Sequence, residues 1–342
     1  QQIFDQAMGI TICDMTTKAG CSMQGAFQKL TRKTVIHKLL RIVSGVLLLL
    51  FLLAISYIIL FPLFRMISDA FTPEQDAYDP SIVWVPKHPT LENFKMAYSM
   101  LNMPFAFFHT LLYQILSALI EVGVCSIVAY GLARFRFREK KLLEFILMLT
   151  ILVPMPMIII PMTVNYSQLD FLGILNLIGG LIGHDIRPNL LNTGFSFWLP
   201  SLLGVGLQSG ILIYIFRQFF RNIPRELEEA ACIDGAGPLR TFLSVVIPSS
   251  GVVFLTVSIF SVIWHWNDAY MPTMFLTDDY PLSVAVSMIS TELVLENMQS
   301  YGVQANGIIM AGCVIFVTPM FVLYLVLQKK FIKSIDRVGI VG

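Results

Sequence analysis

The most chemically distinctive part of the sequence is RELEEAACIDGAG, residues 225–237, which gathers acidic side chains in a mostly apolar chain. Pro224 suits the first position of a helix, where its missing N–H costs nothing. Three glutamates in the first two turns favour the positive end of the helix dipole: Glu226, Glu228 and Glu229. Gly235 can then end the helix in a left-handed conformation. The sequence therefore predicts a short acidic helix after Pro224.

Polar and aromatic side chains within long apolar segments form a second group of candidates. Glu121 is the most notable, because a charge inside a membrane is costly and usually functional. It is predicted either to face a substrate path or to link two helices. The other candidates for a path are Gln114, Gln208, Trp264, Trp266, Asn267 and Asp268. The tryptophans could stack on a sugar ring or belong to an ordinary aromatic belt at the membrane surface.

Catalytic motifs are missing from the sequence. No GxxxxGK[ST] phosphate loop, HExxH or GxSxG string occurs, so the chain is not expected to hydrolyse ATP itself or to be an enzyme. Five cysteines without a CxxC pair predict neither a metal site nor a disulfide framework. A net charge of +1 argues against binding to nucleic acid.

Composition indicates a membrane protein. Of 342 residues, 56% are hydrophobic and 13% charged, whereas soluble domains carry about 25% charged residues. A bilayer core about 30 Å thick needs about 20 apolar residues in a helix. Six windows qualify: 42–64, 105–133, 142–163, 195–216, 249–270 and 307–327. We therefore expect an all-α polytopic membrane protein with six transmembrane helices.

Local features qualify three of these segments. Pro154, Pro156 and Pro161 are expected to kink the third window, because interior prolines remove helix hydrogen bonds. Gly206 and Gly210 form a small-xxx-small pattern in the fourth, which favours helix packing. The apolar stretch 171–183 is too short and too rich in glycine to span, and is predicted to be re-entrant or interfacial.

Basic residues set the orientation. Of 23 lysines and arginines, six precede the first window, five lie between the second and third, four between the fourth and fifth, and four follow the sixth. The positive-inside rule therefore places both termini in the cytoplasm. We expect a cytoplasmic segment 1–41, a permease domain 42–328 with a cytoplasmic loop at about 221–248, and a cytoplasmic tail 329–342.

The predicted acidic helix has one face of small residues. Leu227, Ala230, Ala231 and Asp234 follow one another at i, i+3, i+4 and i+7. A linker lying on the membrane surface is one explanation, but such a helix normally shows lysine and arginine to anionic lipid. Glutamates in their place favour a protein partner.

The same loop carries a family resemblance. Glu229-Ala230-Ala231, then Gly235 and finally Val245-x-Ile247-Pro248 resemble the EAA signature of ABC importer permeases. WHWNDAYMPTMFLTDD at 264–279, YGLARFRFREKK at 130–141 and the proline-rich third window are similar to binding-protein-dependent sugar permeases of the maltose-permease G-subunit type. The resemblance covers roughly residues 35–342. Gly251 stands where the family often has another proline, and the region 165–200 is longer than usual.

The resemblance implies a type I ABC importer permease fold in a bacterial plasma membrane. The helix after Pro224 would be the coupling helix that docks into an ATPase, through Glu228, Glu229, Ala230, Ala231, Asp234 and Gly235. Implied partners are a second permease subunit in a heterodimer, two ATPase subunits and an extracellular substrate-binding lipoprotein. The implied substrate is a carbohydrate, an oligosaccharide in particular. ATP and Mg would be bound by the ATPase, with no cofactor in this chain.

Two other classes of protein compete with this interpretation. An ion-coupled secondary transporter or channel would use Glu121 as its ion-coupling residue. A membrane enzyme acting on a lipid-linked sugar would need a cluster such as His265 with Asp268. Dependence of transport on a partner ATPase separates the importer from the first of these.

Overall fold

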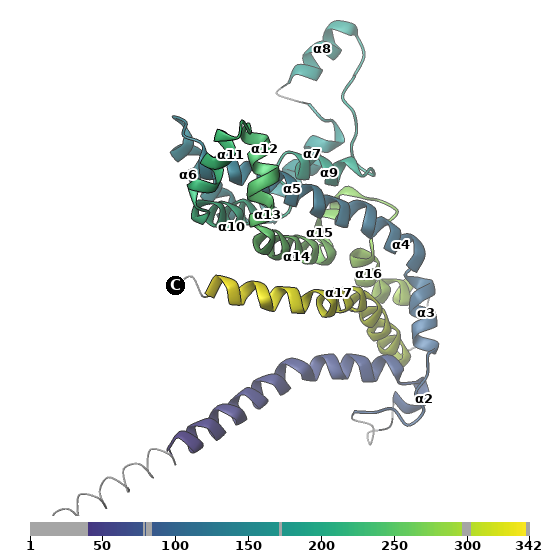
Figure 1. Cartoon of the computed structure of the whole chain (residues 1–342). Coiled ribbons are helices and arrows are strands. Elements are labelled where there is room, and N and C mark those ends of the chain that lie inside the picture. Colours follow the sequence, from purple (N-terminus) through teal and green to yellow (C-terminus); the bar gives the residue numbers. More distant parts are fainter. Residues whose placement is uncertain (1–39, 78, 80–83, 171–172, 296–301, 340–342) are drawn as a thin grey trace, which may run out of the picture. The chain divides into compact units, whose positions relative to one another are not determined.

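The computed structural model describes residues 40–77, 79, 84–170, 173–295 and 302–339, and the regular structure of this part is helical (Figure 1). The chain divides into two units, Gln1–Arg65 and Met66–Gly342. The described part of the first unit belongs to a long apolar helix, Leu40–Phe71, whose side chains from residue 40 to 64 are exposed. Most of the predicted segment 1–41 lies outside the described residues.

In the part of the chain that the structure describes, five of the six apolar windows form helices or bent helix pairs that could cross a membrane. In the described residues, three helices are long and apolar enough to cross a bilayer: Leu40–Phe71, Met103–Arg134 and Ala305–Lys329. Two bent pairs raise this number to five if each pair is one span: Lys140–Leu152 with Met155–Ser167, and Pro238–Ser249 with Gly251–Asn267. An all-helical membrane protein is thus confirmed, with three to five candidate spans on these criteria.

The fourth window is not the continuous helix that was predicted. It consists of α9 (Phe195–Leu202) and α10 (Ser209–Asn222). Gly204 and Gln208, between them, have positive φ angles of 69° and 62°. A left-handed backbone cannot continue a right-handed helix, so the chain turns between α9 and α10.

The third window bends where a proline was expected to kink it. α6 (Lys140–Leu152) and α7 (Met155–Ser167) meet at Val153 and Pro154 with an angle of 100°. Proline disfavours helical backbone at the preceding residue, and Val153 is accordingly extended. The short apolar stretch becomes α8 (Ile174–Ile182), with left-handed glycines at both ends.

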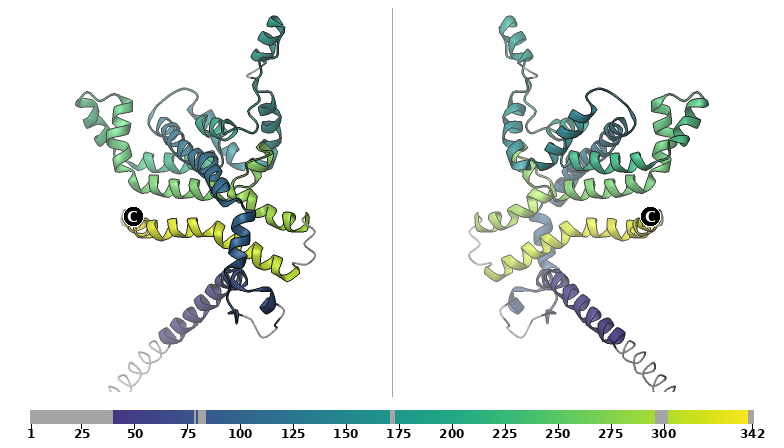
Figure 2. Two further views of the ribbon diagram at one scale, coloured as in Figure 1. Left: turned by 90° about the vertical axis from the view of Figure 1, so that its right-hand side faces the viewer. Right: turned by 90° about the vertical axis from the view of Figure 1, so that its left-hand side faces the viewer.

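The core of the second unit forms around α5 (Leu116–Arg134), which continues α4 (Met103–His109) and the π-helical turn η1 (Thr110–Ile115). α5 packs against α9, α10 and α14 (Gly251–Asn267), and α10 and α14 lie side by side in Figure 2. Because lipid is as apolar as leucine, close contact of small residues stabilises such packing. Ala118, Ala129 and Ala133 supply it on α5, where all three are buried.

The remaining helices are short, apart from the last. They are α2 (Glu74–Ala77), α3 (Glu92–Met100), α11 (Arg225–Ile233), α12 (Pro238–Thr241), η2 (Phe242–Val246), α13 (Ile247–Ser249), α15 (Tyr270–Phe275), α16 (Leu282–Leu295) and α17 (Gly302–Gly339). α3 and α16 pack on α17, and Trp266 of α14 is buried with them in a second apolar cluster. The sequence did not predict α3, α15 and α16.

Candidate functional site

The acidic helix forms as predicted, with a small difference at its start. α11 runs from Arg225 to Ile233, and Pro224 is the N-cap residue instead of the first helical one. Gly235 adopts the left-handed conformation, with φ +81°. The N–H of Ala236 donates to the carbonyl of Ala231 at 2.9 Å, and the N–H of Gly235 donates to Cys232 at 3.0 Å. These bonds satisfy carbonyls at the helix end, so the predicted role of Gly235 in ending the helix is confirmed.

An ion pair fastens α11 to the membrane core. Arg134, the last residue of α5, lies with its Nε 2.6 Å from Glu228 Oε1, and these two side chains are only 7% and 15% exposed. Arg134 Nη2 also donates to the carbonyl of Ile223 at 2.7 Å, and the Tyr130 hydroxyl donates to Glu228 Oε2 at 3.3 Å. Glu228 therefore faces its own chain, although we expected it to face a partner together with Glu229. The missed signal was Tyr130 and Arg134, four residues apart on one face of α5.

The face of α11 opposite Glu228 is open, with Glu229, Ala230 and Ile233 exposed. Cys232, one turn after Glu228, and Asp234 and Gly235, which follow the helix, are also exposed, and no residue of α11 is buried. Within the described part of the chain, Glu229 and Asp234 form no ion pair. Ile233 is 86% exposed, a feature that the sequence analysis did not single out. The predicted small-residue face is divided, because Ala231 is half-buried while Ala230 is exposed.

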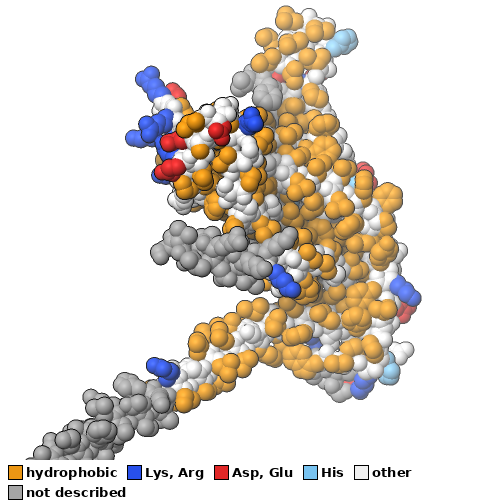
Figure 3. Space-filling model, viewed as in Figure 1, with side chains coloured by type: hydrophobic (Ala, Val, Ile, Leu, Met, Phe, Trp, Pro, Cys, Tyr) orange, Lys and Arg blue, Asp and Glu red, His pale blue; other side chains and the backbone are white. Residues whose placement is uncertain are grey.

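Aromatic rings continue the link from α11 into the core. α11 packs on η2, and the ring of Phe242 in η2 lies 4.9 Å from the ring of Tyr130. The same phenylalanine contacts Phe220 of α10 edge-on at 6.3 Å. α11 is thus connected through η2 with both α5 and α10. Figure 3 shows charged side chains gathered around this end of the molecule, beside a largely apolar surface.

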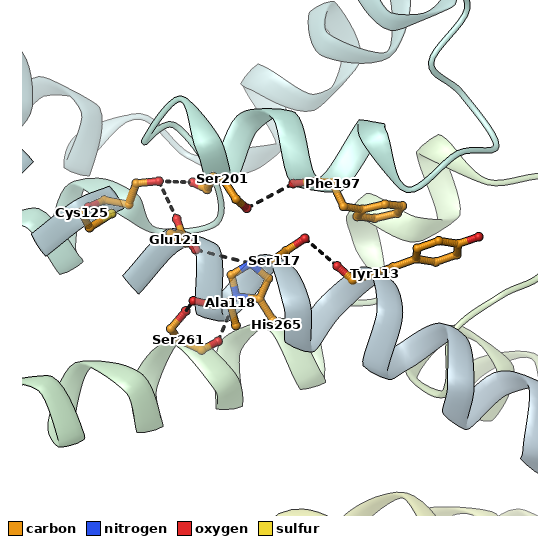
Figure 4. A network of polar contacts seen from close by, with 11 residues as sticks. Tyr113, Ser117, Ala118, Glu121, Cys125, Phe197, Ser201, Ser261 and His265 are labelled. Carbon is orange, nitrogen blue, oxygen red and sulfur yellow. Dashed lines mark hydrogen bonds and ion pairs between the residues drawn. The ribbon is translucent and has the colours of Figure 1, made fainter. Parts of the chain in front are cut away.

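A buried polar network occupies the junction of α5, α10 and α14 (Figure 4). Glu121 is fully buried. Ser209 Oγ lies 2.5 Å from Glu121 Oε1, and His265 Nε2 lies 3.3 Å from Oε2. His265 Nδ1 lies 2.9 Å from the carbonyl of Ser261. Of the two predicted roles for Glu121, the geometry shows a link between helices.

His265 is oriented by its own helix. A carbonyl only accepts hydrogen bonds, so His265 Nδ1 carries a proton toward Ser261. Its Nε2 lies within ion-pair distance of Glu121 Oε2, although Oε2 forms no hydrogen bond in the described structure.

Gly206 makes this close approach possible. A Cβ on Gly206 would lie 2.8 Å from Glu121 Oε1, and one on Gly210 would lie 2.7 Å from Thr150 Oγ1. Such distances are too short for carbon and oxygen without displacement. Both glycines thus lie at close contacts, but only Gly210 packs as part of a helix, because Gly206 lies in the turn before α10.

The other residues predicted for a substrate path fall into two groups. Gln114 is buried and donates to the carbonyl of Asp268 at 2.6 Å. Trp266 is buried as well, stacked on Phe316 with its indole N–H donating to the Phe316 carbonyl, so its ring is not available to a sugar in this conformation. Gln208 and Asn267 are exposed, whereas Trp264 and Asp268 are half-buried. The structure therefore brings Gln114 into contact with Asp268, but it buries Trp266 in a separate apolar cluster and does not gather all of these residues into one site.

Comparison with known proteins identifies the family. Residues 122–337 match the family model described as binding-protein-dependent transport system inner membrane component. The chain belongs to this family, and is a multi-pass permease subunit of an ABC importer in the inner (plasma) membrane, not an enzyme. Its family has no nucleotide site of its own. A system of this kind implies an ATPase and a solute-binding protein as partners.

Individual relatives are similar over most of their length. The chain is 26% identical over 304 residues to the probable starch degradation products transport system permease protein AmyC of Thermoanaerobacterium thermosulfurigenes, covering 89% of this chain and 97% of AmyC. It is 28% identical to the sn-glycerol-3-phosphate transport system permease protein UgpE of Shigella flexneri, covering 81% of this chain and 91% of UgpE. A solved bacterial ABC transporter involved in alginate import has a chain with a similar fold, with a TM-score of 0.64, 18% identity, and coverage of 84% of this chain and 96% of that one.

Proposed function

We propose that this chain is one half of a six-span, type I permease pair that imports an oligosaccharide, with α11 as the helix that receives force from the ATPase. The observation that carries the proposal is the two-faced character of α11. One face is fixed to α5 by Glu228 and Arg134. The other presents Glu229, Ala230 and Ile233 to a partner.

Each part of this face suits docking on a protein. Ala230 allows close approach of a partner surface, and exposed Ile233 provides apolar contact. Glu229 and Asp234 can pair with basic side chains of the partner. Since Arg134 connects α11 with α5, and the Tyr130–Phe242 contact connects η2 beneath it with α5, a push on α11 would move the core helices together. ATP-driven closure of two ATPase subunits would thereby turn the spans from inward-facing to outward-facing. A binding protein could then deliver its solute.

The choice of an oligosaccharide rests on the relatives. AmyC is named for starch degradation products, whereas UgpE is named for sn-glycerol-3-phosphate. Both solutes are rich in hydroxyl groups, and they differ in charge and size. Uptake assays with the reconstituted importer should therefore compare a labelled maltodextrin with labelled glycerol-3-phosphate. Uptake of glycerol-3-phosphate alone would contradict the proposal that the solute is an oligosaccharide, and it would leave the coupling proposal intact.

Glu229→Lys tests the coupling. Like charges brought together at an interface cost several kcal/mol, and each 1.4 kcal/mol is a factor of ten in affinity. We expect substrate-stimulated ATPase activity of the assembled importer to fall about tenfold or more, with normal membrane insertion. Glu139→Lys is the matched control, since Glu139 is also exposed but lies outside α11.

Two outcomes would contradict the coupling proposal. Unchanged ATPase stimulation in the Glu229→Lys importer would show that α11 does not carry the signal. Solute transport that continues after removal of the ATPase subunits would favour an ion-coupled secondary transporter instead.

A further inference from the structure

A basic pocket lies beside α11, on the side that the positive-inside rule assigns to the cytoplasm. Its volume is about 620 Å³. The segment before α6 and the first turn of α6 contribute Arg136, Arg138, Lys140 and Lys141. From α10 and α11 come Arg217, Arg221 and Arg225. The coupling role proposed for α11 does not use this pocket.

The positive charge of the pocket is only partly balanced. Glu144 is the single acidic side chain that lines it, and it lies 2.5 Å from Arg217 Nη2. Arg217 is 6% exposed, and its buried Nε has no hydrogen-bond partner in the described structure. A buried guanidinium N–H without an acceptor is costly. Arg217 lines the pocket, so an anion there would add to the charge balance that Glu144 alone provides.

The backbone of α6 adds to this positive potential. Its first turn contains Lys140 and Lys141 and no acidic residue, and the N-cap residue, Glu139, forms no capping hydrogen bond with its side chain. The N-terminus of a helix carries a partial positive charge and free N–H groups, so lysines there are unfavourable without a counter-ion. Lys140 donates to the carbonyl of Phe135 at 3.2 Å, which holds its ammonium near the start of the helix.

The same helix carries an exposed apolar stripe on a neighbouring face. Leu142, Phe145 and Leu149, spaced to share one face of α6, are 58%, 60% and 42% exposed. In a membrane, such a stripe faces acyl chains, while the basic pocket at its end lies at the level of the headgroups. A lipid fits both features at once, whereas an acidic segment of a protein would use only the pocket.

We propose that this pocket binds the phosphate of an anionic phospholipid from the cytoplasmic leaflet, with the acyl chains along the exposed stripe of α6. Basic pockets between transmembrane helices on the cytoplasmic side suit lipid headgroups of this charge. The lipid phosphate would contact Arg217, Arg221 and the N-terminal turn of α6. Because Arg225 begins α11, the lipid would also lie against the start of the coupling helix.

The test measures lipid retention by the full-length chain. The protein is purified from mixed phosphatidylcholine and phosphatidylglycerol nanodiscs, and bound phosphatidylglycerol is counted by native mass spectrometry. Arg136→Gln with Arg221→Gln removes two exposed pocket charges. Each basic residue near an anionic lipid surface contributes roughly fivefold in affinity, so retention should weaken by about 25-fold. Arg240→Gln with Lys329→Gln is the matched control, since these exposed basic residues lie outside the pocket.

The outcomes separate clearly. Selective loss of phosphatidylglycerol from the pocket variant, with equal thermal stability in pure phosphatidylcholine, supports the site. Equal retention by the pocket and control variants overturns it. Saturation of the pocket by inorganic phosphate, without preference for phosphatidylglycerol, would also overturn it by showing a site for a soluble anion. Neither result depends on whether α11 couples to an ATPase.

Discussion

The ion pair between Arg134 and Glu228 offers the sharpest test of how α11 is held. Arg134→Gln removes the charge 2.6 Å from Glu228 and the donor to the Ile223 carbonyl. A hydrogen bond to a charged group contributes about 1.5–3 kcal/mol, and breaking a fully buried ion pair costs about 3–5 kcal/mol. Because Glu228 is partly exposed, we expect Arg134→Gln to weaken the docking of α11 on the rest of the protein by about 2–4 kcal/mol.

Hydrogen exchange measures this change directly. Amides of α11 exchange when the helix detaches locally, and 1.4 kcal/mol corresponds to a factor of ten in the opening equilibrium. The substitution should therefore accelerate exchange in α11 about 30-fold to several hundred-fold. Exchange in α14 should change little, because α14 does not contact Arg134 or Glu228 through any described hydrogen bond or ion pair.

A conservative variant separates charge from geometry. Arg134→Lys keeps the ion pair but cannot also reach the Ile223 carbonyl with a second nitrogen, so its effect should be intermediate. Unaltered exchange of α11 in Arg134→Gln would refute the reasoning, because it would mean that the pair does not hold the helix. Equal effects on α11 and α14 would point to general destabilisation instead.

Three further predictions concern other parts of the chain. Gly206→Ala places a Cβ 2.8 Å from Glu121 Oε1, and overpacking of this kind costs about 1–3 kcal/mol, measured as a lower thermal unfolding temperature in detergent. His265→Phe should destabilise the protein more when Glu121 is retained than when Glu121→Leu accompanies it, and additive unfolding free energies would contradict the pairing. Arg187 lowers the pKa of Asp185 to about 2 from 3.8 through a hydrogen bond. The contribution of this pair is present above pH 3.8 and lost as the pH falls toward 2, so proteolysis of the segment after α8 should be constant above pH 3.8.

Local signals in the sequence were sufficient to predict the ends of α11 to within one residue and the bend at Pro154. Gly235 and Pro154 act through their own backbone conformations, which depend little on the rest of the fold. The orientation of the Glu228 side chain toward its own chain could not be predicted from such local signals. Its partner Arg134 lies 94 positions earlier in the chain, and only the packing of α11 on η2 and α5 brings the two together.

The fourth apolar window, residues 195–216, shows a different limit of prediction from sequence. Hydropathy is averaged over side chains, and the apolar residues on both sides of GVGLQSG are numerous enough for the segment to be counted within a span. The interruption of the helix depends on backbone conformation at Gly204 and Gln208, which hydropathy does not measure. Trp266 illustrates a similar problem, since a tryptophan in an aromatic belt and one in a buried cluster have the same local sequence. Here its contact with Phe316 decides in favour of the cluster.

α5 connects the two parts of the candidate site. Tyr130 and Arg134 hold α11 at one end of this helix, and Glu121 lies nine residues earlier in the polar network. At 1.5 Å per residue, Glu121 and Tyr130 are roughly 13 Å apart along the axis. A continuous helix of this length transmits a displacement with little loss, and α10 provides a parallel connection through Phe220 and Ser209. A motion that starts at α11 should therefore alter the junction of α5, α10 and α14.

A distance measurement tests this prediction. In an ATP-trapped importer, the spectroscopic distance between labels on α5 and α14 should differ from that in the resting state, and Arg134→Gln should reduce the difference. The same difference in the variant would show that the force enters the core by another route.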